Sequence, residues 1–320
     1  MTTFSFYKES MRETFGMTLV ELGEKYTNLL VLDADLNTST RTVLFKERFP
    51  RRFIQCGVAE GNMLGIAAGL ASLGFITFPC TFAAFAIRKG LDQLFMNICY
   101  PGLNVKIPGS YSGLTASKNG PSHNMMEDIA ITRSLPGLRV VCPGDNRELR
   151  SAMHAIVEYE GPVYFRVPRV VPPVLFSEGY RFNWGKGITL REGKDVALIG
   201  TGITTSICLK AAMLLESEGV SAEVIHMPSI KPLDEETIVK TAKKTGCIVT
   251  VEDGRIFGGF GSAISEVTSR EYPVFVEHVG IGDFVAESDD MSSLMKRYDI
   301  TPEGVVKRVQ LVLKKKRVLC

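Results

Sequence analysis

The strongest constraint on the fold is an alternation of short apolar runs with longer stretches of helical periodicity. Apolar runs of strand length, rich in Val, Ile and Leu, occupy residues 29–35, 75–79, 103–109, 138–144 and 163–168. Helix-type spacing of apolar residues covers 11–26, 61–74, 84–98 and 146–159. Strands and helices in alternation predict βαβ units and a mainly parallel sheet. We therefore expect a first α/β domain over residues 1–170.

The same alternation returns after an interruption. Residues 171–194 are rich in Pro, Gly and aromatic side chains without a clear period, which predicts a linker that crosses a surface. Further strand-length runs follow at 195–202, 221–227, 247–253 and 273–280, with helical stretches between them. A second α/β domain over 195–320 is expected, and 320 residues are enough for two domains with a core each.

Charge and hydropathy exclude several classes of protein. Lys and Arg number 37 against 35 Asp and Glu, so no sequence-wide field exists to bind nucleic acid or an anionic membrane. The uncharged stretch 61–87 is long enough to span a bilayer, but Gly74 and Pro79 divide it into helix, strand and helix. Seven cysteines without a CxxC pair, and an N-terminus without an apolar signal region, lead us to expect a cytoplasmic protein.

Polar residues directly after predicted strands are the first candidates for a site, because ligands of open α/β sheets bind at the carboxyl ends of the strands. Asp33 and Asp35 end the first strand, and the hydroxyl-rich segment 37–40 follows. That segment either donates to phosphate oxygens or forms a polar turn that caps the next helix. His123 lies in the small polar loop SKNGPSHN, where a functional role is more common than on a helix.

Glu60 stands at the entry to a nearly all-apolar helix, within GVAEGNMLGIAAGLA. Glycines at 61, 65 and 69 would let another backbone approach closely, and we expect a helix contact across a subunit boundary there. A carboxylate beside such a surface costs free energy unless it meets a partner, and burial favours proton exchange with a ligand nitrogen. The alternative is a carboxylate that only caps the helix N-terminus.

The motifs taken together resemble the C-terminal half of transketolase, with its pyrimidine-binding and C-terminal domains. The resemblance covers nearly the whole chain and rests on the order and spacing of six motifs: ADL at 34–36, GVAEGNM at 57–63, PCTFAAF at 79–85, NGPSHN at 119–124, RSLPGLRVVCPGDNRE at 133–148 and VEDGRIFGGFGSAISE at 251–266. It implies a thiamine-diphosphate-binding fold with a parallel sheet, followed by a transketolase C-terminal-like domain.

The resemblance also implies roles around the cofactor thiamine diphosphate. Glu60 is similar to the glutamate that bonds the ring nitrogen of the aminopyrimidine and drives the ring to its imino form, which then removes the thiazolium proton. Phe82 and Phe85 match the aromatic residues that pack against the pyrimidine, with core packing as the alternative. Asp35 resembles the acid near the thiazolium.

For the substrate, the resemblance implies that Arg12, Ser39 and Arg166 hold the terminal phosphate of a sugar. It places His123 near the reacting carbonyl and Asn119 facing the sugar. Two departures affect sugar preference: Tyr111 or Ser112 stands where the family commonly has histidine, and Asn119 where it has aspartate. The anionic tail is a phosphate or another oxyanion such as a sulfonate.

The family's GDG…Asn signature for Mg²⁺ and diphosphate is not found in the context that it requires. The resemblance therefore implies a separate N-terminal subunit that supplies the metal ligands, and an α2β2 assembly active on sugar phosphates. Three alternatives stay open: the E1 β subunit of a 2-oxoacid dehydrogenase, a fragment of deoxyxylulose phosphate synthase, and a non-catalytic scaffold of the same fold.

Overall fold

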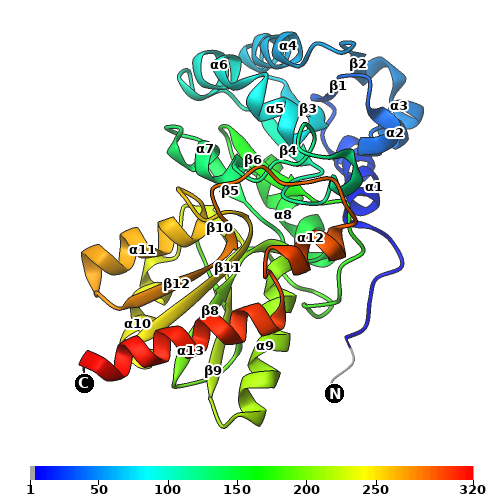
Figure 1. Cartoon of the computed structure of the whole chain (residues 1–320). Coiled ribbons are helices and arrows are strands. Elements are labelled where there is room, and N and C mark those ends of the chain that lie inside the picture. Colours follow the sequence, from blue (N-terminus) through cyan, green and yellow to red (C-terminus); the bar gives the residue numbers. More distant parts are fainter. Residues whose placement is uncertain (1–3, 320) are drawn as a thin grey trace.

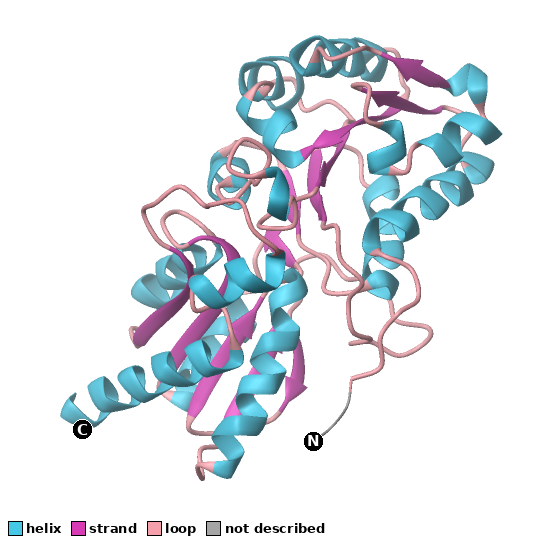
Figure 2. Cartoon of the chain, turned by 45° about the vertical axis from the view of Figure 1, so that its right-hand side comes forward, coloured by secondary structure: helices cyan, strands magenta, loops and turns pink. Residues whose placement is uncertain are grey.

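The computed structural model describes residues 4–319, which form two sheets with helices on both sides of each (Figures 1 and 2). The first sheet has the strand order β10-β5-β6-β4-β3-β1-β2. Its neighbours run parallel except that β10 is antiparallel to β5. Its strands are β1 (Leu29–Asp33), β2 (Phe53–Gln55), β3 (Ile76–Phe82), β4 (Lys106–Ser110), β5 (Arg139–Val141), β6 (Val163–Val167) and β10 (Ser229–Lys231). The parallel sheet predicted for the first domain is present.

Alternate residues of these strands pack on opposite faces, as the period of two requires. Val31 packs with one hydrophobic cluster and Leu32 with another. Helices α1 (Met11–Lys25) and α8 (Asn146–Glu158) cover one face, and α4 (Glu60–Ser72) covers the other. The remaining helices of this half are α2 (Asn37–Thr40), α3 (Val43–Arg48), α5 (Ala83–Arg88), α6 (Leu91–Gln93), α7 (Asp128–Ser134), the 3₁₀ turns η1 (Pro50–Arg52) and η3 (Ser117–Asn119), and the π-helix η2 (Leu94–Cys99).

The single helix expected over 84–98 is instead divided into α5, α6 and η2. Gly90 lies at the first break and packs directly against α4. A Cβ at that position would collide with Leu64 Cδ1 and lie 2.6 Å from the carbonyl oxygen of Ala86. α4 therefore packs closely against the chain at the break between α5 and α6.

The second sheet has the order β12-β11-β8-β9-β7, parallel except for the β7/β9 pair. Its strands are β7 (Ile188–Arg191), β8 (Val196–Gly200), β9 (Ala222–His226), β11 (Cys247–Arg255) and β12 (Phe275–Ile281). Helices α9 (Thr205–Ser217) and α13 (Pro302–Leu319) pack on one face, and α10 (Glu235–Thr245) and α11 (Phe260–Glu271) on the other. The turn η4 (Gly202–Thr204) and α12 (Met291–Arg297) complete the second half.

Three short strands were not anticipated, because they fall outside the apolar runs that mark the other strands: β2, β7 and β10. The last of these crosses from the second half of the chain into the first sheet, and one hydrophobic cluster includes residues of both sheets. The segment after β12 also returns to the first half (Figure 1). There the hydroxyl of Ser288 donates to the carbonyl of Lys118 at 2.6 Å. Within residues 4–319 there is no helix with the length and apolar character that crossing a bilayer demands.

Candidate functional site

Aromatic side chains gather where β3 and β4 end, at the carboxyl edge of the first sheet. Phe82 is the last residue of β3, Phe85 lies one turn into α5, and Tyr111 follows β4. The ring centroid of Phe82 lies 4.1 Å from that of Tyr111 and 5.6 Å from that of Phe85. His123 approaches both phenylalanine rings edge-on, at 6.0 and 5.0 Å. We call these four residues the aromatic wall.

Glu60 lies beside the aromatic wall, at the first turn of α4. Its side chain is only 5% exposed, and both carboxylate oxygens accept from Lys89 Nζ, at 3.2 and 3.4 Å. The same Nζ lies 4.4 Å from the centroid of the Phe85 ring. In the described part of the chain, no main-chain N–H donates to this carboxylate. Glu60 therefore does not cap its helix, and its carboxylate keeps acceptor capacity for a ligand.

Two arginines lie near Tyr111. Arg12 of α1 donates to the Tyr111 hydroxyl at 2.9 Å and to the carbonyl oxygen of Ser39 at 3.3 Å. The guanidinium carbons of Arg12 and Arg169 lie 6.0 and 5.3 Å from the centroid of the Tyr111 ring. Arg12 Nε is buried without a partner among the described residues. Arg12 and Ser39 are thus brought together as expected, and Arg169 is a second cation that sequence reasoning missed.

Arg166 lies elsewhere. Its guanidinium is 5% exposed and donates from Nε to Asp128 at 2.8 Å and from Nη1 to Asp253 at 2.6 Å. Asp128 begins α7 of the first half, and Asp253 belongs to β11 of the second half. The resemblance implies that Arg166 holds the terminal phosphate of a sugar with Arg12 and Ser39, but here its guanidinium is enclosed by the carboxylates of Asp128 and Asp253, between the two halves of the chain. Burial raises the pKa of Asp253. Burial also raises the pKa of the neighbouring Glu252, to about 7.

The loop after β1 is mainly a structural turn. The carboxylate of Asp33 accepts from the Leu36 N–H at 2.6 Å and from the hydroxyls of Thr40 and Thr42 at 3.1 and 2.8 Å. Burial raises the pKa of this carboxyl group. Asp35 adopts the left-handed conformation, with φ of 63°, and is exposed two residues after the end of β1, at the carboxyl edge of the first sheet. Of the two alternatives for this segment, phosphate binding or a polar turn, the contacts of Asp33 and Thr40 are those of a polar turn.

The loop that carries Asn119 and His123 is held from α5. Arg88 donates to the carboxylate of Glu127 at 2.7 Å and to the carbonyls of Pro121 and Asn124 at 3.1 and 3.0 Å. Ser122 Oγ lies 2.8 Å from His123 Nδ1. Asn119 ends η3 and is exposed. Arg88 is a further residue that sequence reasoning missed, because its partners are distant in the sequence.

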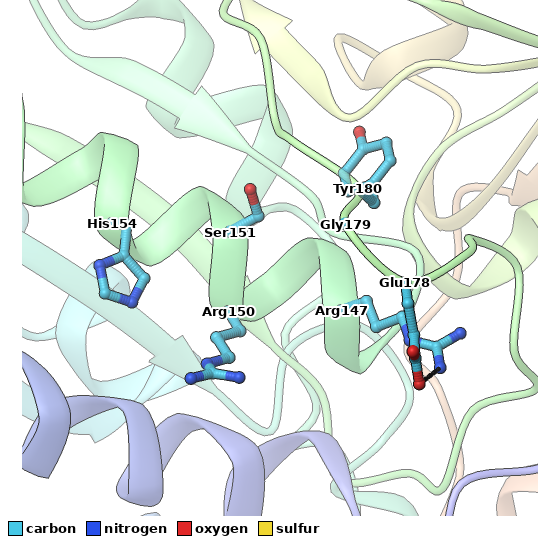
Figure 3. A pocket seen from close by; sticks show the side chains of 7 residues that line it. All are labelled: Arg147, Arg150, Ser151, His154, Glu178, Gly179 and Tyr180. Atoms are coloured by element: carbon cyan, nitrogen blue, oxygen red, sulfur yellow. Dashed lines mark hydrogen bonds and ion pairs between the residues drawn. The ribbon is translucent and has the colours of Figure 1, made fainter.

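A pocket of about 540 Å³ lies apart from these residues, along the outer side of α8 (Figure 3). Its cationic side chains do not converge, since Arg147 contacts Glu178 and Arg150 donates to Glu21. The pocket is lined by Arg147, Arg150, Ser151, His154, Glu178, Gly179 and Tyr180. Among the described residues, no group of three or more His, Cys, Asp or Glu side chains is arranged to hold a metal ion.

Comparison with family models matches residues 8–172 to the transketolase pyrimidine-binding domain and residues 185–305 to the transketolase C-terminal domain. The chain belongs to the transketolase family. Its fold is that of the pyrimidine-binding and C-terminal domains in succession, as the resemblance implied.

Relatives of this transketolase-family chain include separate subunits. The chain is 40% identical to the 6-deoxy-6-sulfo-D-fructose transketolase subunit SqwH of a Clostridium species, over 96% of this chain and 95% of that one. It is 36% identical to one subunit of the apulose-4-phosphate transketolase of Phocaeicola vulgatus, over 95% and 97%. A solved split-gene transketolase, described as an inactive β4 tetramer, superposes with a TM-score of 0.90 at 43% identity, over 96% and 99% of the two chains.

Proposed function

We propose that this chain is the C-terminal subunit of a two-subunit transketolase that transfers a two-carbon ketol unit from an anionic ketose to an aldose. The observation that carries the proposal is the buried Glu60 carboxylate, which has acceptor capacity to spare and lies beside an aromatic wall. Relatives of nearly the same length, named as transketolase subunits for a sulfosugar and a sugar phosphate, support it.

The family implies dependence on thiamine diphosphate, and the residues present fit its aminopyrimidine. Phe82 and Phe85 offer ring faces for stacking, and Glu60 offers an acceptor for a ring nitrogen. The buried hydroxyls of Thr81, Ser110 and Ser112 have no partner among the described residues and lie at the ends of the same strands. When bound, the cofactor supplies a carbanion at its thiazolium carbon.

The chain's own residues then act on protons and charge. Glu60 holds and exchanges a proton at the pyrimidine nitrogen, which a carboxyl group in an apolar wall is suited to do. His123 contacts Ser122 through Nδ1, which leaves Nε2 to bond the oxygen of the reacting carbonyl. Asp35, at the edge of the site, would face the cationic thiazolium.

In this proposal the anionic tail of the substrate binds to Arg12 and Arg169, which both lie near the Tyr111 ring. Arg12, whose buried Nε has no partner among the described residues, and Ser39, whose carbonyl oxygen Arg12 contacts, would hold the tetrahedral oxyanion in this proposal. Asn119 would face the sugar from the loop. A binding site for an oxyanion distant from the reacting carbonyl favours sugar phosphates or sulfonates as substrates. The short 2-oxoacids used by a 2-oxoacid dehydrogenase have no such distant group.

A separate N-terminal subunit completes the enzyme in this proposal, with Mg²⁺ and diphosphate held by that subunit and the assembly α2β2 in the cytoplasm. Two relatives of nearly the same length as this chain are named as transketolase subunits, which supports this division.

Reconstitution tests the proposal. The chain, an N-terminal transketolase subunit, thiamine diphosphate and Mg²⁺ are mixed with ketose phosphates, ketose sulfonates or pyruvate. Turnover of an anionic ketose is expected only with both subunits. Glu60→Gln should keep the melting temperature and lower turnover by about 10²-fold or more, the usual scale of a general acid–base contribution. Unchanged hydrogen–deuterium exchange at the thiazolium carbon in this variant would refute the role of Glu60, and activity on pyruvate alone would favour the dehydrogenase alternative.

A further inference from the structure

One ion pair in the candidate site has no part in the chemistry proposed above. Lys89 Nζ contacts both oxygens of the Glu60 carboxylate, at 3.2 and 3.4 Å, and lies 4.4 Å from the ring centroid of Phe85. A carboxylate acceptor and an aromatic face are also the two features that fit an aminopyrimidine. The Lys89 ammonium group therefore contacts the same carboxylate and the same aromatic ring that an aminopyrimidine would contact.

The main chain keeps Lys89 at this place. Lys89 directly follows α5, and its carbonyl oxygen would lie 3.7 Å from a Cβ at Gly61, the residue after Glu60. Gly90 packs against Leu64 of α4. Because α4 and the end of α5 are in close contact, the lysine cannot move away from Glu60 with its backbone.

The two side chains differ in freedom. The Lys89 side chain is 51% exposed, whereas that of Glu60 is 5% exposed. A long, half-exposed lysine can turn to solvent at little cost, while the buried carboxylate stays where it is. The pair can therefore open by movement of Lys89 alone.

We propose that Lys89 is a displaceable counter-ion that pairs with Glu60 in the cofactor-free subunit and must leave before a pyrimidine ring can bind. This inference rests on the proposed function. The ammonium compensates the buried carboxylate until the ring arrives, and it competes with the ring for the same oxygens and the same face of Phe85. Lys89 is thus a positioning residue that sets cofactor affinity without taking part in proton transfer.

The pair itself is tested without cofactor, by thermal unfolding of the full chain. Lys89→Met should lower the melting temperature by roughly 1–3 °C, because Glu60 loses its partner. The same substitution in a Glu60→Gln chain should have no effect. Lys25→Met is the matched control, since Lys25 forms an exposed pair with Glu158 at 3.4 Å far from the site. An equal shift for Lys89→Met in both backgrounds would overturn the pairing.

Displacement is tested by calorimetric titration of thiamine diphosphate with Mg²⁺ into the complex with the N-terminal subunit. Lys89→Met should bind about threefold to tenfold more tightly than the wild type, the scale of a partly exposed ion pair, and Lys25→Met should bind as the wild type does. Unchanged or weaker binding by Lys89→Met would overturn the inference. If the wild-type complex binds no cofactor, the proposed function fails and the displacement role fails with it, while the unfolding comparison still decides whether the pair exists.

Discussion

At the scale of single residues, Arg166 and Arg169 have opposite surroundings although they are three positions apart. Arg166 is enclosed by Asp128 and Asp253, whereas Arg169 is exposed beside Tyr111. Arg166→Met should lower the free energy of unfolding by about 3–5 kcal/mol, because two buried carboxylates lose their partner. Arg169→Met should leave stability within about 0.5 kcal/mol and raise the KM for an anionic sugar. Urea unfolding measures the stability effect and steady-state kinetics measures the KM effect. A higher KM with unchanged stability in Arg166→Met would instead assign Arg166 to substrate binding.

Lys106 makes a second prediction at this scale. Its side chain is buried, Nζ donates to the carbonyl of Gly161 at 2.8 Å, and burial lowers its pKa to about 7, with the charge of Arg139 adding to the shift. Below pH 7 Lys106 is protonated in both the folded and the unfolded chain, so its buried charge destabilises the folded state in full. Between pH 7 and about 10 the unfolded chain binds the extra proton. The free energy of unfolding should therefore gain about 1.4 kcal/mol per pH unit from Lys106 in that window.

Urea unfolding at several pH values, with Lys106→Met against the wild type, isolates this contribution. The difference between the two chains should change with pH in the stated direction. Lys316→Met is the control, because Lys316 also donates to main-chain carbonyls, at 2.7 Å for Thr245, but is less buried. A difference that stays constant from pH 7 to 10 would show that Lys106 does not titrate there.

At the scale of elements, the packing of α4 against α5, α6 and η2 depends on which glycines face a neighbour. A Cβ at Gly90 would collide with Leu64, and one at Gly61 would lie 3.1 Å from Gln93 Oε1. Gly65 is in looser contact, and Gly69 has nothing within 4 Å. The close backbone approach expected at these glycines therefore occurs within the chain at Gly61, and the subunit contact expected along this helix remains a prediction.

Gly90→Ala and Gly69→Ala form a matched pair for this packing. The first should lower the free energy of unfolding by about 1–3 kcal/mol, because α4 has no room to move away from the added methyl group. The second should raise it by roughly 0.5–1 kcal/mol, since alanine is the better helix former at an exposed helical position. Urea unfolding of both variants is the measurement. A stabilising Gly90→Ala would mean that the two helices do not pack as described.

At the scale of the whole molecule, the two halves share buried polar networks. Glu148 of α8 accepts from the Gly144 N–H and the Tyr180 hydroxyl and contacts His226 Nε2 of β9, each at 2.6 Å. Both Glu148 and His226 are fully buried. Together with the Arg166 network and the strand β10, this contact leads us to expect that the two halves unfold as one cooperative unit.

Glu148→Ala should therefore lower the melting temperature of the entire chain, with a loss of about 3–5 kcal/mol and a single calorimetric transition. Glu178→Ala is the control, because Glu178 is 91% exposed in its pair with Arg147 and should cost no more than about 0.5 kcal/mol. Two separated transitions, with only one of them shifted in Glu148→Ala, would show that the halves unfold independently.

The sequence by itself determined the elements, because periodicity is local. The alternation of apolar runs marked β1, β3, β4, β5 and β6, and the glycines beside Glu60 marked α4 as a packed helix. The motif order also indicated the transketolase family. These signals depend only on neighbours along the chain, so they can be read before any contact is known.

Only the tertiary structure decided which candidates meet. The direction in which Arg166 leaves β6, the approach of Arg169 to Tyr111 and the pairing of Lys89 with Glu60 depend on how separate elements pack. The sequence does not distinguish these charged side chains, because the residue type alone does not indicate whether carboxylates or solvent surround a cationic group. Burial and partners come from contacts 29 to 99 positions apart, as in the bonds from Lys89 to Glu60 and from Arg12 to Tyr111. Long-range packing therefore separated the site residues from the interface residues.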